Sequence, residues 1–253
     1  MAPSGNKHVV FDVVGTLVSY ENFFIALETR LGARLRSLPT PIGSRILGYA
    51  WMEAAEKEYT YLTLSASPYI PVFDVFRSLF YRTLWQAGIS EPREFATDED
   101  REFILSAYRD LDLRPGVQEC FDRLMGAGYT VWCLTAGDVS RVKRYLERGG
   151  VEFPDENFVS CDEIGVGKPQ PRSYEFILEK FKECEQEGKE EREMWFAAGH
   201  MWDAAGARMC EFKGAWVSVW EKEPCLDIFK EMDVIAADLP ALADGIVGHS
   251  TKQ

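Results

Sequence analysis

The chain has 253 residues, of which 46% are hydrophobic and 13% aromatic, so it can bury a sizeable core and is not disordered by composition. Its 28 basic and 41 acidic residues give a net charge of −13 at pH 7. A surface of that sign repels phosphate backbones and anionic bilayers, so nucleic acid and membranes are not expected as partners.

Cysteine, histidine and apolar-run patterns point to an intracellular protein. The six cysteines are scattered without a Cys-x-x-Cys pair, which favours buried, reduced thiols over disulfides. Three histidines are too few for a multi-histidine metal site. The polar lead-in of residues 1–7 has no signal-peptide core, and no apolar run reaches the ~18 residues of a membrane span. We therefore expect a cytoplasmic protein without a bound metal.

The first predicted strand, residues 8–11, is an apolar run that ends in the carboxylate of Asp12, with Gly15 and Thr16 shortly after it. A parallel strand that ends in an acidic side chain places that side chain at the carboxyl edge of the sheet, where open α/β sheets bind ligands. A buried strand followed by an Asp-capped turn explains the same residues. The role of Asp12 therefore depends on what the rest of the chain brings to it.

The next block, residues 19–111, shows helical apolar spacing and no strand pattern. The predicted helices cover residues 22–35, 46–64, 72–87 and 100–108, and residues 88–98 are predicted to form a polar loop. Pro39 and Pro41 end the first helix. We interpret the block as an all-helical subdomain inserted after the first strand.

From residue 112 the pattern changes to strands alternating with helices. The predicted strands cover residues 129–135, 158–160, 194–198, 215–220 and 234–236, and the predicted helices cover 117–125, 139–148, 173–185, 203–212 and 239–247. This alternation predicts an α/β fold, a Rossmann-like doubly wound parallel sheet with helices on both faces. The predicted domains are a core of residues 1–18 and 112–253 and an inserted helical subdomain of residues 19–111.

Three later segments carry polar side chains at or after strand ends. Thr135 closes a strand, Lys168 lies in a glycine-flanked loop, and Asp203 follows the strand 194–198. Parallel strand ends meet at one edge, so one cleft could collect these side chains with Asp12. Taken singly, Thr135 and Asp203 are also explained as helix caps, and Lys168 as a solvated loop residue. The four residues together, in this order along the chain, indicate a shared site more specifically than any one of them does.

The set resembles the haloacid dehalogenase superfamily. The residues that carry the resemblance are Phe11-Asp12-x-x-Gly15-Thr16-Leu17, Leu134-Thr135, Gly167-Lys168-Pro169 with Tyr174, and His200-x-Trp202-Asp203. The resemblance is closest to the L-2-haloacid dehalogenase (type II) branch. It covers nearly the whole chain, because the helical block sits where that branch inserts its cap domain.

The resemblance implies covalent catalysis. Asp12 would attack an electrophilic centre and form an aspartyl ester, which water then opens. Lys168 would keep Asp12 ionised and oriented, because an adjacent cation lowers a carboxyl pKa. Thr16 and Thr135 would donate hydrogen bonds to the nucleophile or to the reacting group. Asp203 would orient Lys168 or help to activate the hydrolytic water.

Val14, two residues after Asp12, restricts the kind of leaving group that the predicted site can release. The phosphatases of the superfamily have at this position an aspartate that protonates the leaving alcohol. Valine donates no proton, so phosphomonoester hydrolysis is disfavoured, while halide and other leaving groups that need no proton remain compatible. Mg²⁺ is disfavoured as well, because the dehalogenase branch works without it and only Asp12 and Asp203 match metal-ligand positions. We therefore expect no cofactor.

The predicted substrate pocket departs from the type II pattern. Ala136 replaces an asparagine that could cradle a halide or carboxylate. Glu53 falls, without gaps, at the anion-binding arginine, which would reverse the charge of the site; Arg45 is the alternative if the helix is shifted. His200 replaces an asparagine and could take a proton from water, since imidazoles titrate near neutrality, although a structural histidine bonded to backbone is equally consistent. Two further residues are predicted to contact substrate, Tyr174 and Trp202.

These features predict a haloacid dehalogenase-like hydrolase with an aspartate nucleophile, acting on a small organic substrate other than a simple 2-haloacid. One alternative is a genuine (S)-2-haloacid dehalogenase with a rearranged anion pocket. The other is a non-catalytic or non-hydrolytic relative that binds a small molecule. A homodimer is compatible with all three.

Overall fold

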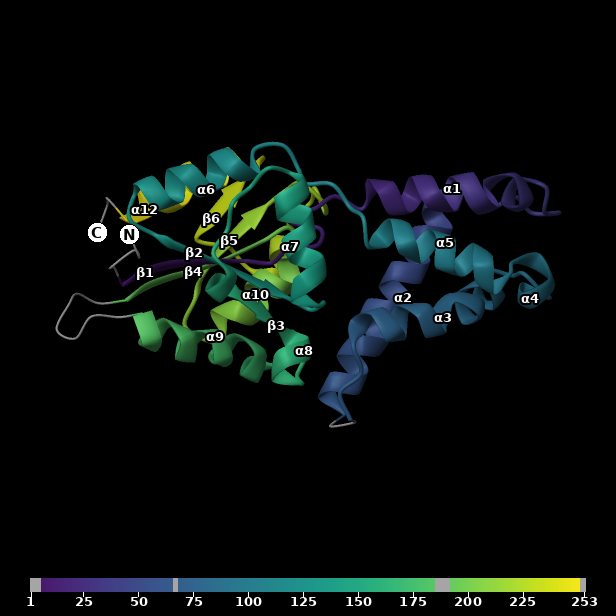
Figure 1. Cartoon of the computed structure of the whole chain (residues 1–253), viewed down its shortest axis with the longest axis horizontal. Coiled ribbons are helices and arrows are strands. Elements are labelled where there is room, and N and C mark those ends of the chain that lie inside the picture. The colour runs from purple at the N-terminus through teal and green to yellow at the C-terminus, as the bar shows by residue number, and fades with distance from the viewer. Residues whose placement is uncertain (1–5, 66–67, 185–191, 251–253) are drawn as a thin grey trace. The chain divides into compact units, whose positions relative to one another are not determined.

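The computed structural model describes residues 6–65, 68–184 and 192–250. The chain divides into two compact units, an α/β unit of Met1–Val18 with Leu113–Gln253 and a helical unit of Ser19–Asp112 (Figure 1). The helical unit is therefore an insertion after the first strand. Within the α/β unit, Val18 and Leu113 pair in an antiparallel bridge where the chain leaves and returns.

Six parallel strands form one sheet within the described part of the α/β unit, in the order β3-β2-β1-β4-β5-β6. They are β1 (Lys7–Phe11), β2 (Thr130–Thr135), β3 (Phe158–Ser160), β4 (Glu193–Ala198), β5 (Lys213–Val217) and β6 (Val234–Ala236). The strand β1 is central, because Phe11 pairs with Cys133 of β2 on one side and with Ala197 of β4 on the other. The strand order reverses beside β1, which is where doubly wound sheets bind ligands. The predicted Rossmann-like fold is confirmed.

The strands are continuous apolar runs because helices cover both faces of the sheet. All six residues of β2 are buried. Helices α6 (Val117–Gly126) and α12 (Leu239–Ser250) pack side by side on one face, and α9 (Pro171–Cys184) and α10 (Met201–Arg208) cover the other (Figure 1). On the α9–α10 face, Trp132, Tyr174 and Phe196 belong to one buried apolar cluster. The remaining short elements are α7 (Val139–Arg148), the 3-10 helix η1 (Asp155–Asn157), α8 (Cys161–Ile164) and α11 (Leu226–Phe229).

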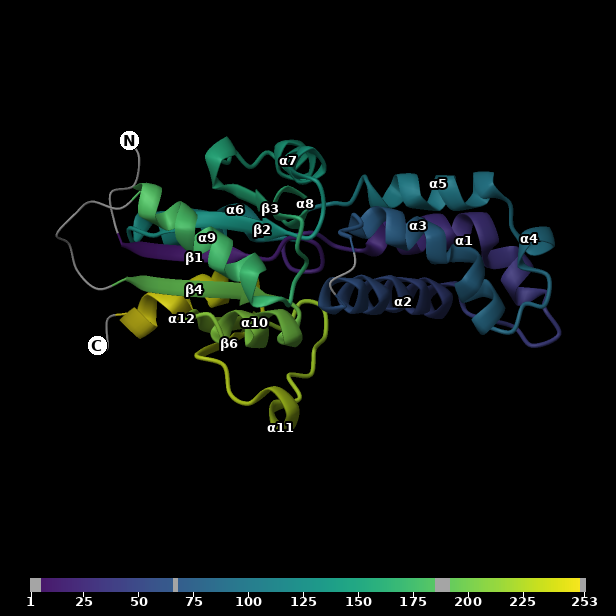
Figure 2. The ribbon, with the colours of Figure 1, turned by 90° about the horizontal axis from the view of Figure 1, so that it is seen from below.

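The helical unit contains no strand among its described residues. Its helices are α1 (Glu21–Arg36), α2 (Ser44–Leu64), α3 (Val72–Gln86), α4 (Pro92–Phe95) and α5 (Asp98–Tyr108), with α2 packed against both α1 and α3 (Figure 2). Trp51 of α2 is at the centre of its core, with its ring 4.5 Å from that of Phe76 and its indole N–H donating to the Phe76 carbonyl at 2.8 Å. Across the described helices of the whole chain, none is long and apolar enough to cross a bilayer.

Several predicted element boundaries were wrong. The predicted helix 203–212 is α10, which instead covers Met201–Arg208. The predicted polar loop 88–98 contains α4, a single turn that begins at Pro92, whose fixed φ suits the first position of a helix. The predicted strand 215–220 instead covers Lys213–Val217, because Gly214 pairs with Phe196 of β4 although its own side chain gives no apolar signal.

The prediction that the cysteines are buried thiols holds in part. Cys120, Cys133, Cys161 and Cys210 are buried thiols, whereas Cys225 is an exposed thiol. The burial of Cys184 lies outside what the structure describes. Burial raises the pKa of the Cys120 thiol to about 12, so this thiol stays protonated at neutral pH.

Candidate active site

Asp12 lies at the carboxyl end of the central strand. Its backbone N–H donates to the Ala197 carbonyl at 3.0 Å, which extends the β1–β4 ladder by one residue and fixes the position of its Cα. Gly15 has φ +95°, a left-handed conformation that favours glycine, and it turns the chain back so that Thr16 reaches Asp12. The sequence therefore places a carboxylate and a hydroxyl at one point of the sheet edge.

Lys168 lies between two buried carboxylates. Its Nζ is 2.8 Å from Asp12 Oδ1 and 2.5 Å from Asp203 Oδ2, and it lies 3.5 Å from the Leu134 carbonyl. Asp12, Lys168 and Asp203 are 7%, 2% and 0% exposed. An ammonium has three N–H donors, and each of these contacts is an acceptor, so the lysine is held in one orientation. The peptide bond that follows it, Lys168–Pro169, is cis.

The hydroxyl of Thr16 has a defined donor direction. It accepts a hydrogen bond from the Gly199 N–H at 2.7 Å, and it lies 2.7 Å from Asp12 Oδ2. Because an N–H can only donate, the single hydroxyl proton is left for the carboxylate. The two oxygens of Asp12 therefore have different partners, Lys168 on Oδ1 and Thr16 on Oδ2.

Tyr174 supports Asp203 from inside the protein. Its side chain is fully buried on α9, and its hydroxyl donates to Asp203 Oδ1 at 2.7 Å. Asp203 lies in the first turn of α10, which begins at Met201, so it is not the helix cap that was one of the two predictions. The carboxylate of Asp203 thus joins Tyr174 to Lys168.

His200 approaches Asp12 from the start of α10. It occupies the N-cap position, and its Nδ1 lies 3.6 Å from Asp12 Oδ2. That separation exceeds a direct hydrogen bond. The neighbouring Trp202 is partly exposed, with its ring centroid 6.1 Å from the imidazole and 6.0 Å from Lys168 Nζ.

The charges of the cluster set the protonation of each member. Burial by itself would raise the pKa of Asp12, but the Lys168 ammonium and the nearby His200 imidazole together outweigh it and hold that pKa well below 3.8. Burial raises the pKa of Asp203, and the nearby charge of Asp12 adds to this, so the attraction of Lys168 offsets it only in part. The two carboxylates in turn keep the pKa of Lys168 above 10.5 despite its burial. Asp12 is therefore an ionised carboxylate beside a charged lysine.

These residues do not fit a Mg²⁺ ion. The ion prefers oxygen ligands in octahedral geometry, and here the oxygens of Asp12 and Asp203 that face each other are already bridged by the Lys168 ammonium. Val14, two residues after Asp12, has a side chain without a ligand oxygen. Among the described residues, no group of three or more His, Cys, Asp or Glu side chains could hold a metal ion.

The other predicted residues are spread over both units. Val14 and Ala136 are partly exposed at the ends of β1 and β2. Thr135 is buried, and its Oγ1 accepts a hydrogen bond from Gly137 N at 3.1 Å, so the predicted contact with Asp12 stays a prediction. Glu53 belongs to α2 of the helical unit, where its side chain is exposed, and its role in substrate binding also stays a prediction. Arg45, the alternative, pairs with Glu21 at 3.0 Å.

Two residues near the cluster were missed in the sequence. The guanidinium of Arg114 donates to the Gly15 carbonyl at 3.1 and 3.2 Å, and so steadies the turn that follows Asp12. A carboxylate oxygen of Glu221 accepts from Met201 N at 2.8 Å, at the start of α10. Both contacts join segments far apart in the chain and involve backbone atoms, so no motif or periodicity signals them.

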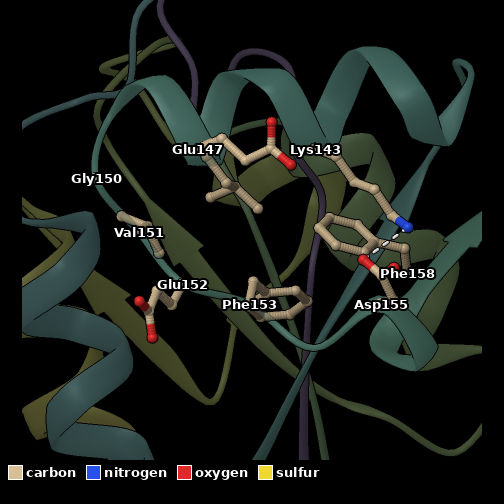
Figure 3. A pocket seen from close by; sticks show the side chains of 9 residues that line it. Lys143, Glu147, Gly150, Val151, Glu152, Phe153, Asp155 and Phe158 are labelled. Carbon is tan, nitrogen blue, oxygen red and sulfur yellow. Dashed lines mark ion pairs between the residues drawn. The ribbon is translucent and has the colours of Figure 1, made fainter.

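A separate hollow of about 440 Å³ lies beside the β3 edge of the α/β unit (Figure 3). Phe153 and Phe158 line it, with their rings 4.8 Å apart, and Lys143 pairs with Asp155 at 2.7 Å on its rim. None of its lining residues belongs to the Asp12 cluster. This hollow is therefore distinct from the Asp12 cluster.

The fold and the site together define a doubly wound α/β enzyme built on an aspartate–lysine–aspartate cluster at the strand switch point. The model of the haloacid dehalogenase-like hydrolases matches residues 6–210, and the chain belongs to this family. The predicted family is confirmed. The chain is accordingly a hydrolase, which weighs against the non-catalytic alternative.

Similar proteins come from the branch that was predicted. The chain is 25% identical over 198 residues to (S)-2-haloacid dehalogenase 4A of Burkholderia cepacia, covering 78% of this chain and 77% of that one. It is 21% identical over 215 residues to the (S)-2-haloacid dehalogenase of Pseudomonas sp. strain YL, covering 84% of this chain and 82% of that one. The L-2-haloacid dehalogenase of Xanthobacter autotrophicus has the same fold, with a TM-score of 0.74 and 21% sequence identity; the match covers 96% of this chain and 98% of that one. A structure of the L-2-haloacid dehalogenase of Xanthobacter autotrophicus with chloropropionic acid covalently bound matches with a TM-score of 0.69 and 20% identity, again over 96% of this chain and 98% of that one.

Proposed function

We propose that this hydrolase acts through a covalent ester on Asp12. The observation that carries the proposal is the state of the Asp12 carboxylate, which is ionised, nearly buried, and held by Lys168 on one oxygen and Thr16 on the other. A carboxylate fixed in this way is a nucleophile with one attacking direction. The covalent chloropropionate complex of the Xanthobacter autotrophicus relative supports the same chemistry here.

In the first step, an Asp12 oxygen attacks the substrate carbon that bears the leaving group. A carbon–oxygen bond forms, the carbon–halogen bond breaks, and the halide leaves with the bonding electron pair, so no proton is needed. Val14 at the site edge agrees with such a leaving group, because its side chain supplies no acid. Lys168 compensates the charge that Asp203 would otherwise place beside the nucleophile.

In the second step, water attacks the carboxyl carbon of the ester. The acyl–oxygen bond breaks, the product leaves with the former Asp12 oxygen as an alkoxide that takes up the proton removed from water, and the water oxygen stays on Asp12. His200 is the base for the water proton in this proposal, since it is the imidazole beside Asp12 Oδ2. Asp203 and Tyr174 hold Lys168 throughout, because both are buried behind it.

The substrate is proposed to be a small organic molecule with a displaceable group on carbon, other than a simple 2-haloacid. Ala136 has no amide that could bind a carboxylate or halide, and Glu53 carries the wrong charge for an anion. The second candidate is a true (S)-2-haloacid dehalogenase, which the names of the relatives favour. Halide release from (S)-2-chloropropionate separates the two: turnover comparable with that of a dehalogenase establishes the second, and none favours the first.

The ester mechanism is tested by a single turnover in ¹⁸O water, followed by mass analysis of the peptide that contains Asp12. We expect one labelled oxygen in Asp12 and an unlabelled first product. Label in the product alone would show direct attack of water and refute the mechanism. Asp12→Asn serves as the control, because its amide cannot act as the carboxylate nucleophile and the peptide should stay unlabelled in the first turnover.

The roles of the two units form part of the same proposal. The α/β unit would be the catalytic core, and the helical unit would be the cap that selects substrate. Glu53→Gln should then change KM and leave kcat nearly unaltered, while an unchanged KM would remove Glu53 from the pocket. A cytoplasmic location and a homodimer complete the proposal, and light scattering of the purified chain tests the latter.

A further inference from the structure

The start of α10 has an unusual cap. His200 occupies the N-cap position with extended backbone angles, φ −106° and ψ 121°, and its side chain makes no capping hydrogen bond. The first N–H groups of a helix have no partner within the helix, and asparagine, aspartate, serine and threonine are the residues that usually satisfy one of them. Histidine is not among them. Another group must supply the acceptor.

Glu221 supplies an acceptor from a different segment. Its Oε2 accepts from the backbone N–H of Met201, the first residue of α10, at 2.8 Å. Glu221 lies in the loop that follows β5, so the contact spans twenty residues of chain. A carboxylate at a helix N-terminus is also stabilised by the helix dipole.

The backbone around Glu221 is bent to present it there. Glu223 N donates to the Glu221 carbonyl at 2.8 Å, which closes a tight turn, and Lys222 between them has φ +65°. A lysine in the left-handed region is strained, and such strain persists where the surrounding structure holds it. The loop is therefore held in one arrangement at the point where it meets α10.

The side chain of His200 is directed at Asp12 and not at the N–H groups of α10. A capping side chain at position 200 would turn back onto the N–H groups of α10, whereas the His200 imidazole instead lies 3.6 Å from Asp12. We propose that Glu221 is a positioning residue: by accepting from the Met201 N–H it holds the peptide that joins His200 to α10, and so keeps the His200 imidazole directed at Asp12, where it serves ester hydrolysis. The last clause rests on the proposed function; the positioning of the ring does not.

The first test needs no substrate and measures the urea unfolding of Glu221→Ala. Loss of an acceptor at a helix N-terminus corresponds to about a fivefold change in the folding equilibrium constant. We expect a loss of that size, because the Met201 N–H would have no other acceptor in its place. A change below about twofold would show that Glu221 does not hold the start of α10 and would overturn the proposal.

Two variants serve as controls in urea unfolding. Glu223→Ala removes the same charge from an exposed side chain of the same loop and should leave the equilibrium constant within about twofold of the natural value. Glu221→Gln keeps an acceptor oxygen and should retain most of the stability. A Glu223→Ala loss as large as that of Glu221→Ala would assign the effect to loop charge and refute the proposal.

The second test asks whether the imidazole moves. The chain has three histidines, so the ring signals of His200 can be assigned by comparison with His200→Asn in proton NMR. Glu221→Ala should shift the His200 ring signals while Glu223→Ala leaves them in place. Unshifted signals in Glu221→Ala would show that Glu221 does not position the ring, even if it stabilises the helix.

The third test uses (S)-2-chloropropionate as probe in a single turnover. Glu221→Ala should slow breakdown of the Asp12 ester about tenfold more than its formation, so that ester accumulates. Equal slowing of both steps, as a general structural defect would produce, counts against the proposal. If the natural enzyme forms no ester with this probe, the compound is not a substrate, as the first substrate reading expects, and the stability and NMR tests decide the role of Glu221. Failure of the proposed ester mechanism is separately visible as turnover of a substrate without label in Asp12.

Discussion

Replacement of Lys168 by methionine would leave two carboxylates buried without their shared cation. Methionine keeps an unbranched apolar stem but removes an ammonium that lies 2.8 Å from Asp12 and 2.5 Å from Asp203. Removal of one partner from a buried ion pair costs ~3–5 kcal/mol. Because one cation here serves two carboxylates, we expect a loss of about 5 kcal/mol at pH 7, a large share of the ~5–15 kcal/mol that stabilises a typical protein.

The loss should depend on pH with a defined sign. In the natural chain the depressed pKa of Asp12 contributes stability above pH 3.8, which is lost only as the pH falls through the depressed value. In Lys168→Met, burial and mutual repulsion raise the pKa of the carboxyls in the folded state, so folding takes up protons. The difference from the natural chain should therefore shrink as the pH falls from 7 to 5, by up to about 1.4 kcal/mol per pH unit and per proton.

Urea unfolding at pH 7, 6 and 5, followed by tryptophan fluorescence, measures this difference. Trp132, Trp195 and Trp216 are buried in the α/β unit and report its unfolding. The double variant Lys168→Met with Asp203→Asn removes one of the two charges and should recover part of the stability at pH 7. A loss that is the same at all three pH values, with no recovery in the double variant, would refute the electrostatic argument and leave only altered packing.

Three further results are expected. Thr16→Val should lower kcat about 10- to 100-fold, because a hydrogen bond to the Asp12 carboxylate is worth ~1.5–3 kcal/mol, whereas Thr16→Ser should retain activity; steady-state rates that fall equally for both would contradict this reading. Tyr174→Phe removes a donor to Asp203 without changing shape and should cost about 1.5–3 kcal/mol in urea unfolding, and a change under about 0.5 kcal/mol would show that the bond is dispensable. Treatment with a chelator should leave turnover unchanged, because the Lys168 ammonium already lies between the carboxylate oxygens of Asp12 and Asp203 that a metal ion would need; activity lost on chelation and restored specifically by added Mg²⁺ would disprove this.

The parts of the fold that the sequence predicted are those with local periodic signals. Continuous apolar runs such as β2 and helical spacing such as that of α6 gave the α/β fold, the insertion and most boundaries. The carboxylate of Asp12 could be placed at the sheet edge because a parallel strand has only one carboxyl end. The prediction that Lys168 and Asp203 lie close to Asp12 used the same rule, because parallel strands end at one edge of the sheet. The family resemblance then selected these two residues from the other polar residues near strand ends.

The parts that the sequence did not predict depend on contacts between distant segments. Asp203 was considered as a helix cap, and only its burial between Lys168 and Tyr174 shows why an acidic residue sits inside the first turn of α10. Glu221 and Arg114 act on backbone atoms, which any residue offers, so their partners cannot be inferred from side-chain patterns. Local sequence gives the elements; it does not give the polar bonds between them.

The central place of β1 has a consequence for how the chain is made. This strand is synthesised before the other strands of the sheet, and its two neighbours are β2 and β4, which begin at Thr130 and Glu193. The sheet cannot close around β1 until β4 has been translated, and pairings of such long sequence separation form slowly. The inserted helical unit, whose residues precede β2 and β4 and contact one another, can fold before β1 has its neighbouring strands. Asp12 is thus synthesised well before Lys168 and Asp203, the partners that complete its cluster.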